Sequence, residues 1–359
     1  MTQGNRMDDR NADKVVVIGP ERWLEHARRF SDFTHLQESV FATAMADRTR
    51  SELEHVVIER SGMMRAAAIV RIHHVPIGRD IAYINGGPLM LLKEAGSSPP
   101  VEDILAALRS EYQVRRGCLL YIQPTITSFM EIDDLQGQIL AGGFEPDASR
   151  RRYRTILIRT DASIEVMRQS LHGKWRNSLK KAESSGLEIE DDDSPEMLAR
   201  VDPLFSDLVQ QKSFKTLMPS GTFTSLQWSD GRSPVLRAAV ASLEGTDVAC
   251  LLYGMHGLGA IYLVGASGAD GRRINASYLL QWHVIRRCHD AGVRWYDLGG
   301  IDTDDNPDVY RFKDRMGGKK VELPGQWRAM GGGVRGLLTR SLVRLHLRRN
   351  ARITGRSIR

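Results

Sequence analysis

The fold is decided by the stretch Trp295-Tyr-Asp-Leu-Gly-Gly-Ile and by Tyr310-Arg-Phe-Lys-Asp-Arg-Met-Gly-Gly, whose Lys313 follows that isoleucine by twelve residues. A short apolar and aromatic run ends in two glycines, an acidic loop comes next, and a small basic and aromatic helix then ends in glycine. This order places a backbone turn, carboxylates and a cation at the mouth of a sheet, where α/β proteins usually keep their chemistry.

Two long segments of the chain, 56–88 and 236–268, have the same pattern of apolar runs and turns. Each is predicted to form a strand, a tight glycine turn, a second strand, a loop and a third strand. An amphipathic helix (101–115 or 275–291) and a final apolar strand (119–123 or 293–298) complete each copy. Tyr83 and Tyr262 occupy matching places in the third strands. The simplest interpretation is a duplicated α/β domain, and the alternative is one large irregular α+β domain.

Helices are also predicted before and within the copies, at 21–30, 36–46, 163–185 and 196–212. The polar, basic run after Pro146 lies between apolar runs and predicts a domain boundary. We therefore expect a leader at 1–14, domains at 15–155 and 156–330, and a separate tail at 331–359. Each domain is predicted to hold a mixed, mostly antiparallel sheet flanked by helices.

Composition is that of a soluble globular protein, with 42% hydrophobic and 26% charged residues. No apolar stretch approaches the roughly 20 residues needed to span a bilayer, and the polar N-terminus predicts a disordered leader rather than a signal peptide. Cys118, Cys250 and Cys288 each lie in an apolar setting. They are predicted to be buried free thiols, as is usual in a reducing cytosol.

The net charge of +6 belongs to the C-terminal tail. Residues 331–359 contain eight arginines and no acid, and the rest of the chain has 42 basic and 44 acidic residues. Val334, Leu337, Leu338, Leu342 and Leu345 have helical spacing in this tail. Three interpretations remain open: a basic amphipathic helix on an anionic membrane, a tail that contacts RNA, and a solvated nonspecific tail.

The segment Lys174-Trp-Arg-Asn-Ser-Leu-Lys-Lys-Ala-Glu predicts an amphipathic helix with four cations in eight residues. Such a basic helix face either binds phosphates or a nucleic-acid backbone, or is simply exposed to solvent. Composition alone favours the solvent-exposed face. The acidic loop from Asp302 fails the EF-hand template, because Pro307 and Lys313 stand where glycine and glutamate are required. Its carboxylates are predicted to stabilise the start of the helix near Val309.

Asp297 is the more informative acid, since a carboxylate at the end of a buried strand needs a partner. The sequence has no Gly-x-Ser-x-Gly elbow, no Walker loop, no Cys-x-x-Cys and no histidine pair with zinc-ligand spacing. We therefore predict neither a covalent nucleophile nor a metal site.

Four motifs in order resemble the Fem family of aminoacyl-tRNA-dependent N-acyltransferases, which are built on the GNAT fold. They are Ile84-Asn-Gly-Gly-Pro-Leu, the Lys174 segment, Asn275-Ala-Ser-Tyr-Leu-Leu-Gln-Trp, and Tyr296-Asp-Leu-Gly-Gly-Ile through Phe312-Lys313. The resemblance extends over about residues 20–327. It implies two tandem GNAT-like domains and transfer of an aminoacyl group from charged tRNA to an amine, as on a peptidoglycan precursor peptide.

The resemblance also assigns roles to residues of this chain. Lys313 and Asp297 would be catalytic, and Phe312, Lys313 and Arg311 would meet the donor, with Phe312 stacked on a terminal base or ribose. The acceptor would be bound by the residues Lys174, Arg176, Tyr83, Asn85 and Tyr262. Asn85 and Gly86 stand where the family usually has a proline and a basic residue, and Leu-Met-Leu-Leu after Pro88 replaces a family acid. These departures leave the identity of the acceptor open.

The donor has two candidates. An acetyl-CoA enzyme of this fold needs a glycine-rich turn whose amides bind the pyrophosphate at a helix N-terminus. The corresponding place reads Arg272-Arg-Ile-Asn-Ala-Ser, in which Asn275 is predicted to be an ordinary N-cap. Aminoacyl-tRNA is therefore preferred as co-substrate, with no cofactor, and acyl-CoA-dependent transfer in cell-envelope polysaccharide or small-metabolite assembly is the alternative. We expect a cytoplasmic monomer, with peripheral membrane contact through the tail.

Overall fold

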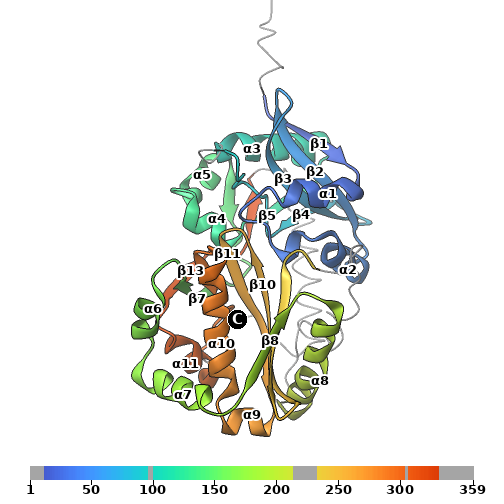
Figure 1. Cartoon of the computed structure of the whole chain (residues 1–359). Helices are drawn as coiled ribbons and strands as arrows, with labels where there is room; N and C mark the ends of the chain where they lie inside the picture. Colours follow the sequence, from blue (N-terminus) through green and yellow to red (C-terminus); the bar gives the residue numbers. More distant parts are fainter. Residues whose placement is uncertain (1–11, 96–99, 213–232, 304–305, 331–359) are drawn as a thin grey trace, which may run out of the picture. The chain divides into compact units, whose positions relative to one another are not determined.

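The computed structural model describes residues 12–95, 100–212, 233–303 and 306–330, which belong to two compact units (Figure 1). The first unit comprises the chain up to Arg151 together with the segment that begins at Pro324. The second unit comprises Arg152–Leu323.

The first unit is built on a seven-stranded sheet in which β4 and β5 are parallel and all other neighbours are antiparallel. Across the sheet the order is β1 (Lys14–Ile18), β2 (Glu52–Arg60), β3 (Met63–His73), β4 (Ile81–Asn85), β5 (Leu119–Gln123), β14 (Trp327–Ala329) and β6 (Phe144–Pro146).

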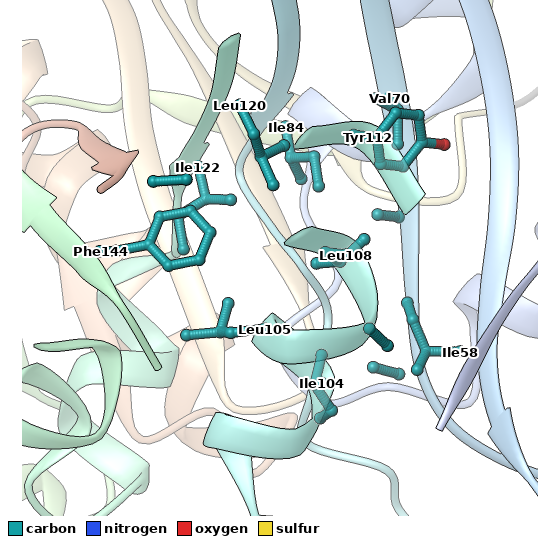
Figure 2. Close-up of a cluster of buried hydrophobic side chains, with 14 of the residues drawn as sticks. Ile58, Val70, Ile84, Ile104, Leu105, Leu108, Tyr112, Leu120, Ile122 and Phe144 are labelled. Carbon is teal, nitrogen blue, oxygen red and sulfur yellow. The ribbon is translucent and has the colours of Figure 1, made fainter. Parts of the chain in front are cut away.

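Helices of the first unit cover this sheet. They are α1 (Pro20–Ala27), α2 (Ser39–Thr49), α3 (Val101–Leu108), α4 (Ile126–Glu131) and α5 (Leu135–Ala141). Figure 2 shows how Ile104 and Leu108 of α3 lie among strand side chains such as Ile84 and Leu120. The predicted helix 101–115 is α3 followed by a π-helical segment, η2 (Arg109–Arg115).

The second unit repeats this plan. Its sheet runs β8 (Glu188–Asp192), β9 (Leu236–Leu243), β10 (Thr246–His256), β11 (Gly259–Ser267), β12 (Trp295–Asp297), β7 (Tyr153–Arg159) and β13 (Lys319–Leu323). Only β11 and β12 are parallel among these described strands. The helices are α6 (Ile164–Ser170), α7 (Gly173–Glu183), α8 (Pro195–Lys212), α9 (Ala269–Arg273), α10 (Ala276–Asp290) and α11 (Pro307–Asp314).

Two local expectations about helices were wrong. The single helix predicted over 163–185 is broken into α6 and α7, because Leu171 and His172 are extended, with ψ of 138° and 143°. His172 then caps α7 by accepting a hydrogen bond at Nδ1 from Lys174 N. Asn275 does precede α10, but it adopts a left-handed conformation (φ 63°) and makes no side-chain cap.

The strand orders confirm the predicted fold class of two tandem GNAT-like domains, and they add a strand exchange. In each sheet the parallel strand (β5 or β12) and the last strand (β6 or β13) have one more strand between them. That strand is β14 in the first sheet and β7 in the second. In the sequence, β14 follows β13 of the second sheet, and β7 follows β6 of the first sheet. Each sheet is therefore completed by a strand that comes directly after the other sheet's last strand. The second domain predicted over 156–330 is corrected accordingly: β7 begins at Tyr153, and β14 belongs to the first sheet.

Three further expectations concern the ends of the chain and the thiols. The leader predicted over 1–14 is too long, since Lys14 begins β1 and the Asp13 carboxylate lies 3.1 Å from Arg60 Nη2. Residues 1–11 and the tail 331–359 lie outside the described residues. Cys118, Cys250 and Cys288 are buried and free, as predicted. Among the described residues, no helix has the length and apolar character of a membrane span.

Candidate functional site

The two parallel strands of the second sheet part at Asp297. Their pairing covers only Gly259–Ile261 against Trp295–Asp297. Beyond it, β11 continues to Ser267 with a bulge at Leu263, because Leu252 pairs with Val264 and Tyr253 with Tyr262. The chain after Asp297 stays instead with β7, where Leu298 N donates to Ile156 O at 3.0 Å. Beyond Ile261, the edge of β11 on this side therefore has no strand partner among the described residues.

Asp297 lies at the point of divergence and is 1% exposed. Its Oδ2 accepts a hydrogen bond from the Tyr153 hydroxyl at 2.8 Å, and its Oδ1 accepts from Gly299 N at 2.8 Å and from the Thr155 hydroxyl. Burial raises the pKa of this carboxyl, and these hydrogen bonds together with the nearby Lys313 charge oppose the rise. The partner that the sequence required for Asp297 is thus a set of β7 hydroxyls and a backbone amide.

The Gly299–Gly300 turn comes directly after β12. Gly299 has a φ of +73°, and a Cβ at this position would lie 2.8 Å from the Tyr262 carbonyl oxygen. Glycine is needed here both for the left-handed conformation and for the close approach to β11. The bond from Gly299 N to Asp297 Oδ1 makes Asp297 the anchor of this turn.

Lys313 comes to the same turn from α11. Its Nζ donates to Gly300 O at 3.0 Å and to Gly299 O at 3.4 Å, and it lies 5.3 Å from the centre of the Tyr262 ring. The residue is only 6% exposed. Burial lowers the pKa of the amine to about 8, against the pull of the Asp297 charge in the opposite direction. Burial also raises the pKa of the Tyr262 hydroxyl.

An aromatic cluster surrounds the preceding residue of α11, Phe312. Its ring centre lies 5.0 Å from that of Tyr278 on α10, edge to face, and 6.0 Å from that of Trp175 on α7. The ring centres of Trp175 and Tyr278 lie 5.0 Å apart. Phe312 and Tyr278 are half-buried and Trp175 is buried, so the partly exposed edge of this cluster is available for stacking.

The predicted cations of this unit fall into two groups. Lys174 is exposed at the start of α7, and its ammonium has no carboxylate partner within ion-pair distance among the described residues. Arg176 and Arg311 are exposed but are engaged locally: Arg176 Nη1 donates to Gln169 O at 2.8 Å, and Arg311 Nη2 pairs with Asp308 at 2.7 Å.

The end of β11 is occupied by α9, a short helix that the sequence did not reveal. Its backbone amides are used within the chain: Arg272 N bonds to Gly268 O, Ile274 N to Asp270 O and Asn275 N to Arg272 O, at 3.0–3.3 Å. Gly271 packs so closely that an added Cβ would collide with Val248 O. Three of the amides in the segment that corresponds to a pyrophosphate-binding turn therefore already have partners.

In the first unit, Tyr83 and Asn85 lie together near the end of β4. The Tyr83 hydroxyl donates to Gln123 Oε1 at 2.7 Å and lies 3.3 Å from Asn85 Oδ1. Arg71 lies over the Tyr83 ring, 5.3 Å from its centre. Tyr83 and Tyr262 are not equivalent in pairing, because Tyr83 pairs with Tyr121 of β5 whereas Tyr262 lies one residue beyond the last β11–β12 pair.

The structure thus brings Asp297, Lys313 and Tyr262 together, with Phe312 adjacent, and places Tyr83 beside Asn85 in the other unit. Sequence reasoning missed Tyr153, Thr155 and Tyr278. The strand at 153–159 precedes its sheet neighbours by more than a hundred residues, and only the hydroxyls that alternate along it, at Tyr153 and Thr155, hinted at a shared face.

Comparisons with known proteins agree with this geometry. Residues 239–331 match the model of the FemAB family. Among solved structures, FemX is 15% identical, with 89% of this chain and 98% of the FemX chain covered and a TM-score of 0.70. A search of curated proteins gave no sequence match.

Two further structures are similar. One is a conserved protein of unknown function from Bacteroides thetaiotaomicron (9% identity, 88% and 98% coverage, TM-score 0.55). The other is the C-terminal DUF2156 domain of a putative lysylphosphatidylglycerol synthetase from Agrobacterium fabrum (12%, 89% and 93%, 0.50). At such identities these likenesses establish the fold alone. They confirm the predicted fold, and the FemAB match over 239–331 agrees with the predicted resemblance to the Fem family of acyltransferases.

Proposed function

Because the second domain carries the FemAB-family segment on a FemX-like fold, we propose that the protein transfers an aminoacyl group from aminoacyl-tRNA to an amine. The acceptor proposed is a peptidoglycan precursor peptide, and the site of transfer is the divergence of β11 and β12. The proposal places the activity in the cytoplasm, where charged tRNA is found.

The chemistry requires little of the protein. An aminoacyl ester is already activated, so the amine attacks its carbonyl carbon, a C–N bond forms and the bond to the ribose oxygen breaks. The amine loses a proton and the ribose oxygen gains one. The protein must hold the two reactants and stabilise the oxyanion of the tetrahedral intermediate.

Lys313 is suited to the oxyanion because its position is fixed before substrate arrives. The Gly299 and Gly300 carbonyls hold its ammonium, and Asp297 holds their turn. A cation held in a site with little water stabilises developing charge more strongly than one in solution. The role of Asp297 is then to position this turn, since its oxygens are already occupied by Tyr153, Thr155 and Gly299. The edge of β11 beyond Ile261, which has no strand partner in the part of the chain that the structure describes, offers backbone groups to the acyl chain.

The observation that favours RNA over CoA is α9. In an acyl-CoA enzyme of this fold the pyrophosphate would bind free amides at this place, but here the amides of Arg272, Ile274 and Asn275 bond to carbonyls of the chain itself. The partly exposed aromatic cluster around Phe312 instead suits a terminal base or ribose.

The test is a transfer assay with purified protein, tRNA charged with labelled amino acids, and nucleotide-linked or lipid-linked muropeptides. The expected result is label in the muropeptide that disappears when the tRNA is digested with RNase beforehand. Label transferred from acyl-CoA but not from tRNA would replace this proposal with the acyl-CoA alternative. Absence of transfer from either donor would refute both.

A further inference from the structure

The α7 and α9 helices carry a cluster of cations that the transfer chemistry does not use. We call it the α7–α9 surface, and it consists of Lys174, Arg176, Lys180 and Lys181 on α7 with Arg272 and Arg273 on α9. All six side chains are exposed. The two helices lie at the same end of the second unit (Figure 1), and Lys181 Nζ donates to Arg273 O at 3.1 Å. The cations of both helices therefore belong to one surface.

This surface has an excess of positive charge. The two helices contribute six basic residues and two acids, Glu183 and Asp270. The Glu183 carboxylate accepts hydrogen bonds from Nη1 and Nη2 of Arg168, at 2.7 Å each, and the Asp270 carboxylate lies 3.3 Å from Arg273 Nη2. Lys174 and Lys180 have no carboxylate within ion-pair distance among the described residues. The like charges are thus largely uncompensated, which favours an anionic partner.

The surface also leads to the donor end of the site. Lys174 is the neighbour of Trp175, whose ring contacts both Tyr278 and Phe312. Arg272 and Arg273 lie at the place where other enzymes of this fold would bind a pyrophosphate through amides. Here the side-chain cations are exposed while the amides of Arg272, Ile274 and Asn275 are occupied, an arrangement suited to phosphates spread along a chain rather than to one embedded pyrophosphate.

We propose that the α7–α9 surface binds the phosphate backbone of the RNA donor, next to its aminoacylated end. This inference rests on the proposed function and assigns Lys174 to the donor, where the sequence resemblance had assigned it to the acceptor. The contacts are electrostatic and independent of base sequence, so they raise the affinity for RNA and leave the chemical step unchanged. Arg176 contributes least, since its guanidinium is bonded to two carbonyls at the end of α6, whereas that of Arg272 is bonded to one, the Ser267 carbonyl.

The experiment compares wild type with a surface variant that combines Lys174→Gln, Lys180→Gln and Arg272→Gln. Binding of uncharged tRNA is measured at several salt concentrations. Each phosphate contact contributes about 0.7–0.9 to the slope of log affinity against log salt, so three lost contacts should lower the slope by about 2–3. The KM for charged tRNA should rise about 30-fold at physiological salt, while kcat and the KM for the acceptor stay at the wild-type values.

The matched control removes three cations elsewhere in the same unit, with Arg287→Gln, Arg294→Gln and Lys319→Gln. Arg287 is exposed in the second half of α10, Arg294 is exposed just before β12, and Lys319 is exposed on β13. This variant should bind tRNA as wild type does. Equal losses in both variants would overturn the proposal, because binding would then depend on net charge alone. Wild-type affinity of the surface variant would overturn it as well.

A short donor separates the surface from the chemistry. The aminoacyl ester of a 3′-terminal trinucleotide is too small to extend along both helices, so wild type and the surface variant should use it equally well. A large defect of the surface variant on this donor would assign its cations to the transfer step and overturn the proposal. If wild-type protein neither binds tRNA nor uses either RNA donor, the proposed function itself is refuted. If wild type is active and the surface variant binds tRNA equally well, only the role of the α7–α9 surface is refuted.

Discussion

In the first sheet, β4 and β5 pair along their whole lengths, from Ile81 with Leu119 to Asn85 with Gln123. Gly87 N then donates to Gln123 O at 3.0 Å and extends the pairing past the strand ends. In the second sheet, β11 and β12 pair over three residues and part at Asp297. The two sheets share one topology, but the parallel pair stays together to its end in the first sheet and separates in the second.

We call the β4–β5 pair closed, because it stays paired to its end, and the β11–β12 pair open, because it separates at Asp297. The two pairs differ in the contacts made at the end of the pairing. In the first sheet the buried Gln37 amide donates to Asn85 O and accepts from Ile69 N, both at 2.7 Å, and so bridges β3 and the end of β4. In the second sheet the bulge at Leu263 turns β11, and Asp297 binds the next turn instead of a neighbouring strand. This difference favours the second domain for acyl transfer, because there a strand edge that no described strand pairs with lies beside the buried Lys313.

The largest effect is expected from Asp297→Ala. This change leaves the Tyr153 hydroxyl and Gly299 N without an acceptor, leaves Thr155 with Gly299 O as its acceptor, and loosens the turn that holds Lys313. Transfer should fall about 1,000-fold, and the free energy of unfolding should fall by about 3 kcal/mol. Denaturant titration and the tRNA-dependent assay measure the two losses. Asp297→Asn keeps an acceptor for Gly299 N and should retain most of the stability; equal losses in both variants would argue against the anchoring role.

Lys313→Ala tests the cation itself and should lower kcat/KM about 100-fold. Because the Lys313 pKa is about 8, its charge is lost above that pH, and the wild-type rate should decline there. Lys313→Arg stays charged, so any activity it retains should lack this decline. An unchanged alkaline limb in that variant would assign the decline to another group.

Stability responds to the same pKa. The folded chain releases this proton near pH 8 and the unfolded chain near 10.5, so the unfolded state binds more protons between these values. The penalty of burying the charge is fully present below about pH 8 and is relieved above it. The free energy of unfolding of wild type relative to Lys313→Met should therefore rise with pH across this window, and a flat difference would contradict the lowered pKa.

A smaller effect is expected from Gly299→Ala, for which the chain offers a matched control in the first unit. Gly62 has a similar φ of +77° but no atom within 4 Å of an added Cβ, whereas at Gly299 the Cβ would meet Tyr262 O at 2.8 Å. Gly62→Ala should cost about 1 kcal/mol of backbone strain. Gly299→Ala should cost about 1 kcal/mol more and lower transfer about tenfold. Equal effects of both changes would show that the contact with β11 is unimportant.

Tyr83→Phe in the closed sheet should have the smallest effect. It removes the hydroxyl that donates to Gln123 and lies beside Asn85, one hydrogen bond worth about 1 kcal/mol. If this end of the first sheet binds the acceptor, the KM for the acceptor should rise about fivefold while the KM for tRNA is unchanged. An effect on the KM for tRNA alone would contradict the assignment of Tyr83 to the acceptor.

The repeated strands were predictable because alternating apolar residues and glycine turns are local signals. Lys313, Asp297 and their turn were likewise visible as a strand, two glycines and a basic helix. The burial of Lys313 was not, since a lysine in a short basic helix is usually exposed, and here carbonyls from another loop enclose it. The break between α6 and α7 was missed because neither residue at the break, Leu171 or His172, is a proline or a glycine.

Long-range pairing explains the other omissions. Thr155 was unremarkable until β7 was placed beside β12, and nothing local marks the three residues of β14 as a member of the first sheet. The position of a short strand in a sheet depends on which neighbouring strands lack a partner. The periodicity of its own sequence does not contain this information.

The exchange of β7 and β14 has a consequence for how the chain is made. The first sheet needs Trp327, buried among side chains synthesised some two hundred residues earlier, before β6 can be joined to β5. On the ribosome, the N-terminal domain is therefore the first to begin folding but cannot finish until the second has almost entirely emerged. A chain that ended just after Leu323 would contain every residue of the proposed transfer site in the second sheet, but its first sheet would lack β14.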